Sequence, residues 1–108
     1  MTVSEFALKN GLKALALPEP DRVIEGGYIG DLLSWVMSKA ESGNAWITIM
    51  SNANICAVAT LTDVSCIILA ESVELEESIR ALAEEKGINI LSSELSAFEL
   101  ASKLSADI

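Results

Sequence analysis

The chain has 108 residues, 51% of them hydrophobic, with a formal net charge of −9. This length is typical of one domain, and the aliphatic content excludes a disordered acidic tail. The acidic balance argues against nucleic acid or an anionic membrane surface as a partner, because both require a surplus of lysine and arginine. We therefore expect a single domain over residues 1–108.

The first thirty residues predict one helix and two strands. Residues 4–10 are typical of a short helix that ends at Gly11, and residues 12–17 alternate as in a strand that ends at Pro18. A second short strand is predicted at residues 22–24. No basic or long apolar leader precedes these elements, and no apolar stretch approaches a membrane span, so we expect a cytoplasmic protein.

A second helix is predicted between Asp31 and Gly43. The Asp31 side chain is placed to accept a hydrogen bond from a first-turn amide, as a helix N-cap does. One face of this helix is apolar; it consists of Leu32, Leu33, Val36, Met37 and Ala40. Trp35 falls outside that face, which places it either at the edge of the core or on a surface that contacts a partner.

The remaining residues alternate between strands and helices. Residues 45–50 and 65–69 are predicted as buried strands, and residues 88–91 as a short third one. Asn54 is placed to cap a helix through about Leu61, although residues 55–61 are also compatible with a strand. Further helices are predicted at residues 74–86, before Gly87, and from Ser96 to about Leu104, where Ser96 and Glu99 form a capping box.

Strands that alternate with helices require crossover connections. The expected fold is therefore α/β, with a mostly parallel or mixed sheet covered by helices. Residues 71–108 hold nine Asp or Glu and three Lys or Arg, which is typical of solvated helix faces and also compatible with an acidic docking face.

No residue pattern predicts catalysis. The chain has no histidine, no spacing that pairs a nucleophile with a base, and no phosphate-binding loop ending in Gly-Lys-Ser/Thr. Cys56 and Cys66 lie in apolar runs, which favours burial over metal binding, and an iron–sulfur cluster normally takes four thiolates. We expect no enzyme activity, no metal and no cofactor.

The glycines at 26, 27 and 30 are the stretch that most resembles a functional loop. Glycine permits positive φ and a close approach to the main chain. A phosphate is disfavoured there because Asp31 places a negative charge where the anion would bind. A tight turn, or a loop that seats a neutral group or a neighbouring chain, is the preferred interpretation.

Several ordered segments together resemble the DRTGG domain family. These segments are residues 21–34, 46–49, 54–59, 87–91 and 96–99, and the resemblance extends over about residues 12–104. The family's Asp-Arg and Gly-Gly pairs are present as Asp21-Arg22 and Gly26-Gly27, but three residues separate them here. Met50 and Asn52 stand where relatives often carry Gln and His, while Asn54 is retained.

The resemblance implies a fold like the non-catalytic N-terminal domain of HPr kinase/phosphorylase, and a regulatory role. Similar domains accompany CBS modules and phosphotransacetylase, and short versions resemble proteins found beside iron-only hydrogenase subunits in anaerobic bacteria. The first expectation is thus an accessory module that docks on a hydrogenase or a kinase-like signalling partner. The alternatives are a sensor of nucleotides or phosphorylated metabolites and, more distantly, an iron–sulfur-binding hydrogenase component.

Two further expectations concern association and the site. A chain this short buries only about 60–70% of its unfolded surface, and Trp35 requires cover, so we expect a homodimer. Open α/β sheets bind ligands at their strand ends. The residues expected to bind a ligand or partner are Gly26, Gly27, Asp31, Thr48, Asn52 and Asn54.

Overall fold

Five strands and five helices make up the computed structural model, which describes all 108 residues. The strands are β1 (Lys13–Ala16), β2 (Gly26–Ile29), β3 (Asn44–Thr48), β4 (Cys66–Leu69) and β5 (Ile90–Ser92). The helices are α1 (Val3–Asn10), α2 (Leu33–Lys39), α3 (Asn54–Thr62), α4 (Glu77–Lys86) and α5 (Ala97–Asp107).

All five strands belong to one sheet in the order β1-β5-β4-β3-β2. Strands β2 to β5 are parallel, and β1 is antiparallel to β5 at one edge. This arrangement confirms the predicted α/β fold with a mixed, mostly parallel sheet.

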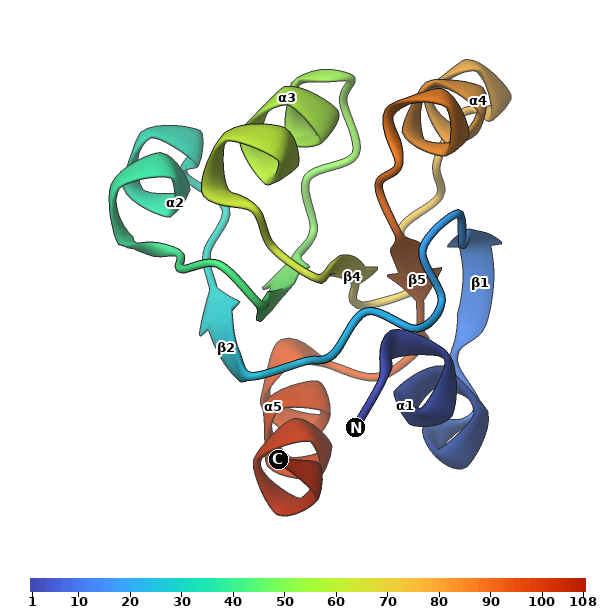
Figure 1. Ribbon diagram of the computed structural model, residues 1–108, viewed down its shortest axis with the longest axis vertical. Helices are drawn as coiled ribbons and strands as arrows, with labels where there is room; N and C mark the ends of the chain where they lie inside the picture. Colours follow the sequence, from blue (N-terminus) through green and yellow to red (C-terminus); the bar gives the residue numbers. More distant parts are fainter.

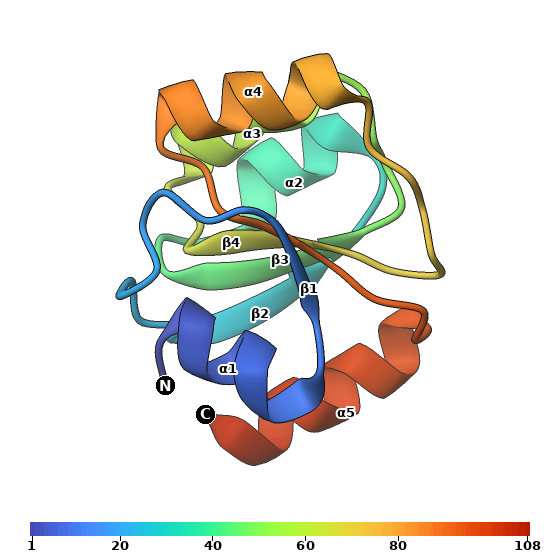
Figure 2. The same cartoon turned by 90° about the vertical axis from the view of Figure 1, so that its right-hand side faces the viewer.

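The sheet lies between two layers of helices (Figure 1). Helices α2, α3 and α4 each connect neighbouring parallel strands, and crossovers of one hand place all three on the same face. Helices α1 and α5 cover the opposite face (Figure 2). Because successive strand residues point to opposite faces, Trp46 belongs to the core under α2–α4 and Ile47 to the core under α1 and α5.

Sequence patterns at the helix ends predicted most of these ends correctly. The capping box of Ser96 and Glu99 is present in full, and Gly11 and Gly87 end α1 and α4 with φ of 68° and 75°. Residues 55–61, left open between helix and strand, are helical in α3. Helix α4 begins at Glu77, three residues later than predicted.

Two expectations around β2 and α2 are wrong. Residues 22–24 form no strand; Val23 makes a single bridge to Thr2, and the strand begins at Gly26 instead. Helix α2 ends at Lys39, well before Gly43, and only Val36 of its predicted apolar face is fully buried. Trp35 is 57% exposed, with the Lys39 ammonium 5.3 Å from its ring centroid.

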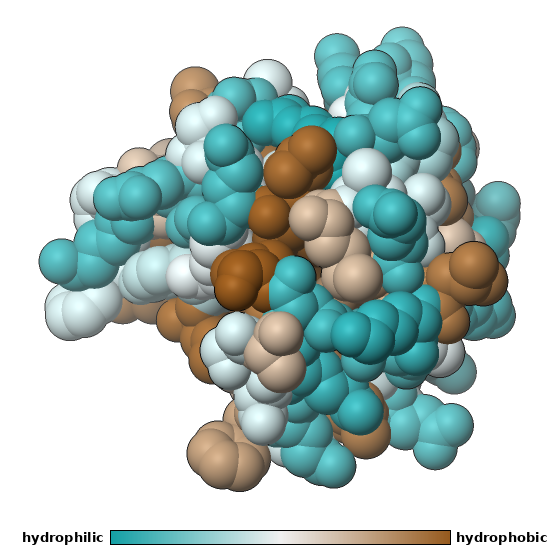
Figure 3. Space-filling view, turned by 60° about the horizontal axis from the view of Figure 1, so that its bottom comes forward, coloured by the Kyte–Doolittle hydropathy of each residue, from teal (hydrophilic) through white to brown (hydrophobic).

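Apolar residues are also exposed on the face that carries α1 and α5. They form a band between hydrophilic regions in the view of Figure 3. Leu8, Phe98 and Ile108 are each more than half exposed. None of the five helices combines the length and the hydropathy that crossing a membrane requires.

Candidate functional site

Gly26 and Gly27 lie within β2, which corrects the predicted glycine loop. They pair with Asn44 and Ala45 of β3, and neither has a positive φ. A Cβ atom on Gly27 would lie 2.7 Å from Cδ2 of Leu104, so the absence of a side chain allows α5 to pack closely on the edge strand. Gly27 also lines a mostly apolar groove of about 210 Å³ between β2 and α5.

Asp31 and Thr48 are the two predicted site residues that the structure brings into contact. Asp31 Oδ1 accepts hydrogen bonds from Thr48 Oγ1 at 2.8 Å and from the Ile49 amide at 3.0 Å. Asp31 is not the cap of α2, as was predicted; Leu32 occupies the N-cap position without a side-chain bond. The carboxylate fixes the loop after β2 to the end of β3 instead.

Asn52 and Asn54 form a turn at the start of α3. Asn52 Oδ1 accepts a hydrogen bond from the Asn54 amide at 2.9 Å, and both residues are exposed. Ala53 occupies the N-cap position, so the predicted capping role of Asn54 is wrong. The predicted site residues do not line one cleft, because Gly26 and Gly27 lie at the amino end of β2 whereas the others follow or end β2 and β3.

A crevice of about 450 Å³ lies at the other side of the sheet, between β1, β5 and the start of α4. The loop after β4 runs to α4 on one face, and the loop after β5 runs to α5 on the opposite face (Figure 2). Such a divergence of neighbouring strands is the topological switch point at which open α/β sheets bind ligands. Lys13, Arg80, three serines and two glutamates contribute to its lining.

A β-bulge in β1 orients one of the two cationic side chains. Ala14 pairs with Leu91 and Ala16 with Ile90, so Leu15 is one residue more than the ladder accommodates. The Leu15 carbonyl accepts a hydrogen bond from Arg80 Nε at 3.1 Å. Arg80 is therefore held by the backbone of the bulge, and its remaining donors are available beside the crevice.

The loop after β4 is strained where it borders the crevice. Glu71 and Ser72 have φ of 60° and 59°, a conformation that costs a residue with a side chain about 1–2 kcal/mol. Their amides donate to the carbonyls of Leu95 and Ser93, at 2.9 and 2.8 Å. The loop after β5 thus holds the strained turn in place, and these two hydrogen bonds join the two loops.

Both cysteines are buried free thiols, as predicted. Burial raises the pKa of Cys56, and it raises the pKa of Cys66 to about 12. The neutral thiol is a poor nucleophile and a poor metal ligand. No three His, Cys, Asp or Glu side chains are grouped to hold a metal ion.

Comparison with known proteins settles the family. A sequence model described as DRTGG domain matches residues 29–106, well over half of the chain. The chain belongs to the DRTGG domain family. No curated protein matches the DRTGG domain described here.

A solved structure shares the fold of this DRTGG domain. It is the crystal structure of the CBS and DRTGG domains of the regulatory region of Clostridium perfringens pyrophosphatase, complexed with the activator diadenosine tetraphosphate. The TM-score is 0.73 at 15% sequence identity, over 95% of this chain and 45% of the other. The DRTGG domain therefore spans about half the length of that relative.

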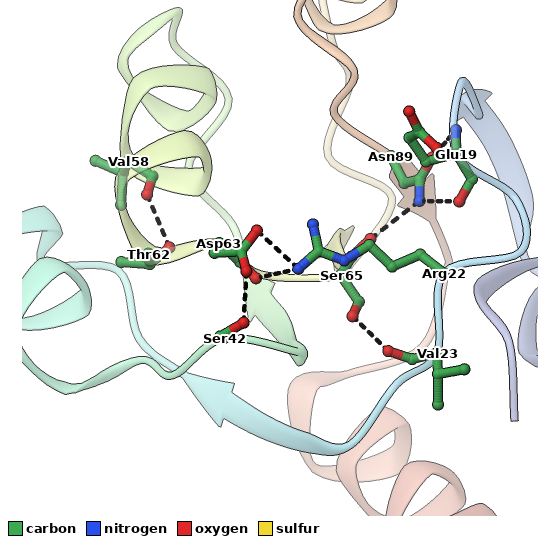
Figure 4. Close-up of polar contacts among 9 residues, drawn as sticks. All are labelled: Glu19, Arg22, Val23, Ser42, Val58, Thr62, Asp63, Ser65 and Asn89. Carbon is green, nitrogen blue, oxygen red and sulfur yellow. Dashed lines mark hydrogen bonds and ion pairs between the residues drawn. The ribbon is translucent and has the colours of Figure 1, made fainter.

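Arg22, the second residue of the Asp-Arg pair that resembles the family motif, has a structural role. The Arg22 guanidinium binds the carbonyl of Asp63 at 2.6 Å and its carboxylate at 2.8 Å (Figure 4). The Ser42 hydroxyl and Arg22 together lower the pKa of the Asp63 carboxyl. Arg22 thus fixes the segment between β1 and β2 to the end of α3, opposite the crevice.

Asn89 fixes the same segment from the other side. Its Oδ1 accepts a hydrogen bond from the Glu19 amide at 2.9 Å, while Nδ2 donates to the carbonyls of Glu19 at 2.7 Å and Ser65 at 3.0 Å (Figure 4). Ser65 in turn donates to the Val23 carbonyl at 2.6 Å. Backbone hydrogen bonds of Arg22 and Ile24 to Val3 and Met1 complete the fixation of this segment, which contains no strand at residues 22–24.

Sequence reasoning missed the residues that line the crevice. Lys13 and Arg80 come from an edge strand and a helix that are far apart in the chain, so no local spacing connects them. The signal available was the pair of loops after two successive buried strands, at residues 70–76 and 93–96. It became useful only when the strand order showed that these loops diverge.

Proposed function

We propose that this DRTGG domain is a non-catalytic regulatory module that senses a small molecule in the crevice between β1, β5 and α4. The family match and the regulatory region that shares its fold support a regulatory or sensor role. The observation that carries the proposal is the position of the crevice at the topological switch point, where two strand-end loops and two cationic side chains converge.

The strained turn at Glu71 and Ser72 adds to this argument. Strained backbone persists only where its surroundings impose it, and such positions cluster at ligand-binding and switching sites. Here the loop after β5 imposes it through two backbone hydrogen bonds. A ligand between the loops would thereby affect both α4 and α5, which gives a sensor a route to opposite faces of the domain.

Backbone amide NMR of the ¹⁵N-labelled chain tests the proposal. We would add pools of nucleotides, sugar phosphates, amino acids and carboxylic acids, and map the shifted amides. Saturable shifts at residues 71–75 and 92–95 support a sensor. Shifts elsewhere, or none from any pool, contradict the assignment to this crevice.

A second candidate function is docking on a partner, and the exposed apolar residues near the end of β2 favour it. Leu32 at the N-cap of α2 lies one turn before Trp35, and the neighbouring Asp31 accepts a hydrogen bond from the Ile49 amide. All three apolar side chains are at least half exposed. Single exposed apolar residues are ordinary, but such a group is typical of an interaction surface.

The occupant of that surface would be a hydrogenase or kinase-like partner or a second copy of the chain. Sedimentation velocity at tens of micromolar tests self-association. If the chain forms a dimer and the Trp35→Ser variant is monomeric, the result supports a homodimer through this surface. A single 11.5 kDa species contradicts it.

A further inference from the structure

This inference rests on the proposed sensor function and concerns the ligand of the same crevice. We infer that the ligand is a phosphate monoester with a hydroxyl-rich body, of about the size of a nucleoside monophosphate or a pentose phosphate. Its phosphate binds between Lys13 and Arg80, and its hydroxyls donate to Glu74 and Glu94.

The two cations are the first reason. The chain has only seven Lys and Arg against sixteen Asp and Glu, so two cations at one crevice do not reflect a generally basic surface. The Arg80 Nε–H is bound by the Leu15 carbonyl, which leaves the terminal guanidinium nitrogens to bind an anion. One of them lies 3.6 Å from Glu77, whose side chain is 86% exposed; this contact is weak and easily exchanged.

Hydroxyl donors lie beside the cations. Lys13 pairs with Ser92 in the β1–β5 register, so their side chains are neighbours on the same face of the sheet. Ser72 and Ser93 border the crevice from the two strand-end loops. The Ser93 hydroxyl accepts a hydrogen bond from the Leu95 amide at 3.0 Å, and its own proton is therefore free for a further acceptor.

The two carboxylates set the charge of the ligand. Glu74 and Glu94 line the same crevice and repel an anion the more strongly the more negative charge it carries. A phosphate monoester carries about −1.5 to −2 at neutral pH, which matches Lys13 and Arg80. A triphosphate would place additional charge against the carboxylates. Hydroxyl groups, by contrast, are the donors that carboxylate oxygens accept.

The volume sets the size of the ligand. Ligand sites typically enclose about 300–1,000 Å³, and the crevice encloses about 450 Å³. That space exceeds what inorganic phosphate alone would fill. It is comparable to the space that a sugar phosphate with or without a small base would occupy.

Isothermal titration with defined probes tests the inference. The probes are AMP, CMP, ribose 5-phosphate, adenosine, inorganic phosphate and ATP, at low and at physiological ionic strength. We expect at least one of the monoesters AMP, CMP and ribose 5-phosphate to bind with saturation, and to bind more tightly than adenosine, inorganic phosphate or ATP. Added salt should weaken the binding, because the crevice is open to solvent.

Substitutions at the crevice identify the groups involved. Lys13→Gln and Arg80→Gln should each weaken monoester binding about tenfold or more. Glu74→Gln should reduce the preference for the monoester over ATP. Lys39→Gln is the matched control, because it removes one cation on α2 away from the crevice. Lys13 is exposed on an edge strand, so its variant should fold even if the Arg80 variant does not.

The outcomes separate this inference from the proposed function. If uncharged or non-phosphorylated molecules shift the amides around the crevice and no monoester binds, the domain is a sensor and our ligand class is wrong. The ligand class is also wrong if monoesters bind equally well to Lys13→Gln and Lys39→Gln. If no probe in either experiment reaches the crevice, both proposals fail.

Discussion

Replacement of Asn89 by alanine should remove a large part of the stability of the domain. The side chain is 2% exposed and makes three hydrogen bonds, two to Glu19 and one to the Ser65 carbonyl. A net hydrogen bond contributes about 1 kcal/mol, and a buried carbonyl left without a donor costs about 1–3 kcal/mol. Water can reach Glu19 but not the Ser65 carbonyl, so we expect a loss of about 3 kcal/mol. Domains of this kind have about 5–15 kcal/mol in all.

Urea unfolding measures this loss. Trp46 is fully buried and Trp35 is largely exposed, so the change in tryptophan fluorescence on unfolding comes mainly from Trp46 in the core. We expect a lower midpoint with an unchanged slope, because the folded state remains as compact. In a thermal scan, the melting temperature should fall by about 10–20 °C.

Two further variants test whether the buried bonds of Asn89 hold the segment between β1 and β2. Asn52→Ala removes an exposed asparagine with one local hydrogen bond, and its effect should stay within about 0.5 kcal/mol. Asn89→Asp keeps the size but turns a carboxylate oxygen toward two carbonyls, and it should cost at least as much as Asn89→Ala at pH 7. If Asn89→Ala is no more destabilising than Asn52→Ala, the segment between β1 and β2 is not held as we describe.

Three more predictions concern packing and pH. Gly27→Val should destabilise the domain by about 1–3 kcal/mol, because its Cβ would lie 2.7 Å from the Leu104 side chain of α5. Denaturant unfolding measures this loss, and an unchanged midpoint would contradict the close packing of α5 on β2. Burial raises the pKa of Cys66 to about 12, so on raising the pH this thiol loses its proton in the unfolded chain before it does so in the folded chain. The free energy of unfolding should therefore fall as the pH rises above 9, by up to about 1.4 kcal/mol per pH unit. Cys66→Ala should make that alkaline slope shallower, and an identical slope would count against the buried thiol. The Ser42 hydroxyl and then Arg22 lower the pKa of Asp63. The stability that the ionised carboxylate adds is therefore present above about pH 4 and is lost as the pH falls through the lowered pKa. Asp63→Asn should therefore reduce stability at pH 7 and flatten the acid limb of the pH–stability curve.

Elements that depend on neighbours in the sequence were predictable. The capping box at Ser96 and the left-handed glycines at positions 11 and 87 act within one helical turn, so residue type and spacing determine them. The alternation of buried strands with helices likewise predicted the parallel part of the sheet.

The predictions were wrong where contacts between residues far apart in the sequence determine the local structure. Gly26 and Gly27 have low strand propensity, yet they form an edge strand, where Gly27 allows Leu104 of α5 to pack closely on the sheet. Asp31 has the chemistry of a helix cap, but Thr48 and the Ile49 amide offer it two bonds across the strand ends.

The candidate site was unpredictable for the same reason. Its two cations belong to β1 and α4, and the crevice exists only because β1 adds to the sheet beside β5. The six residues expected to bind a ligand or partner remain a prediction at the β2 and β3 side of the domain.

The position of β1 has a consequence for how the domain assembles during synthesis. Among the strands of this sheet, β1 is the first to leave the ribosome and its partner β5 is the last, since Lys13 pairs with Ser92. At about 5–20 residues per second, β1 waits on the order of 4–15 s for that partner. Strands β2 to β5 can join one after another as they emerge, whereas β1 must close a loop of most of the chain, the slowest kind of contact to form. The crevice is therefore incomplete until β5 has been made and has paired with β1, and so is the ligand site that we propose there.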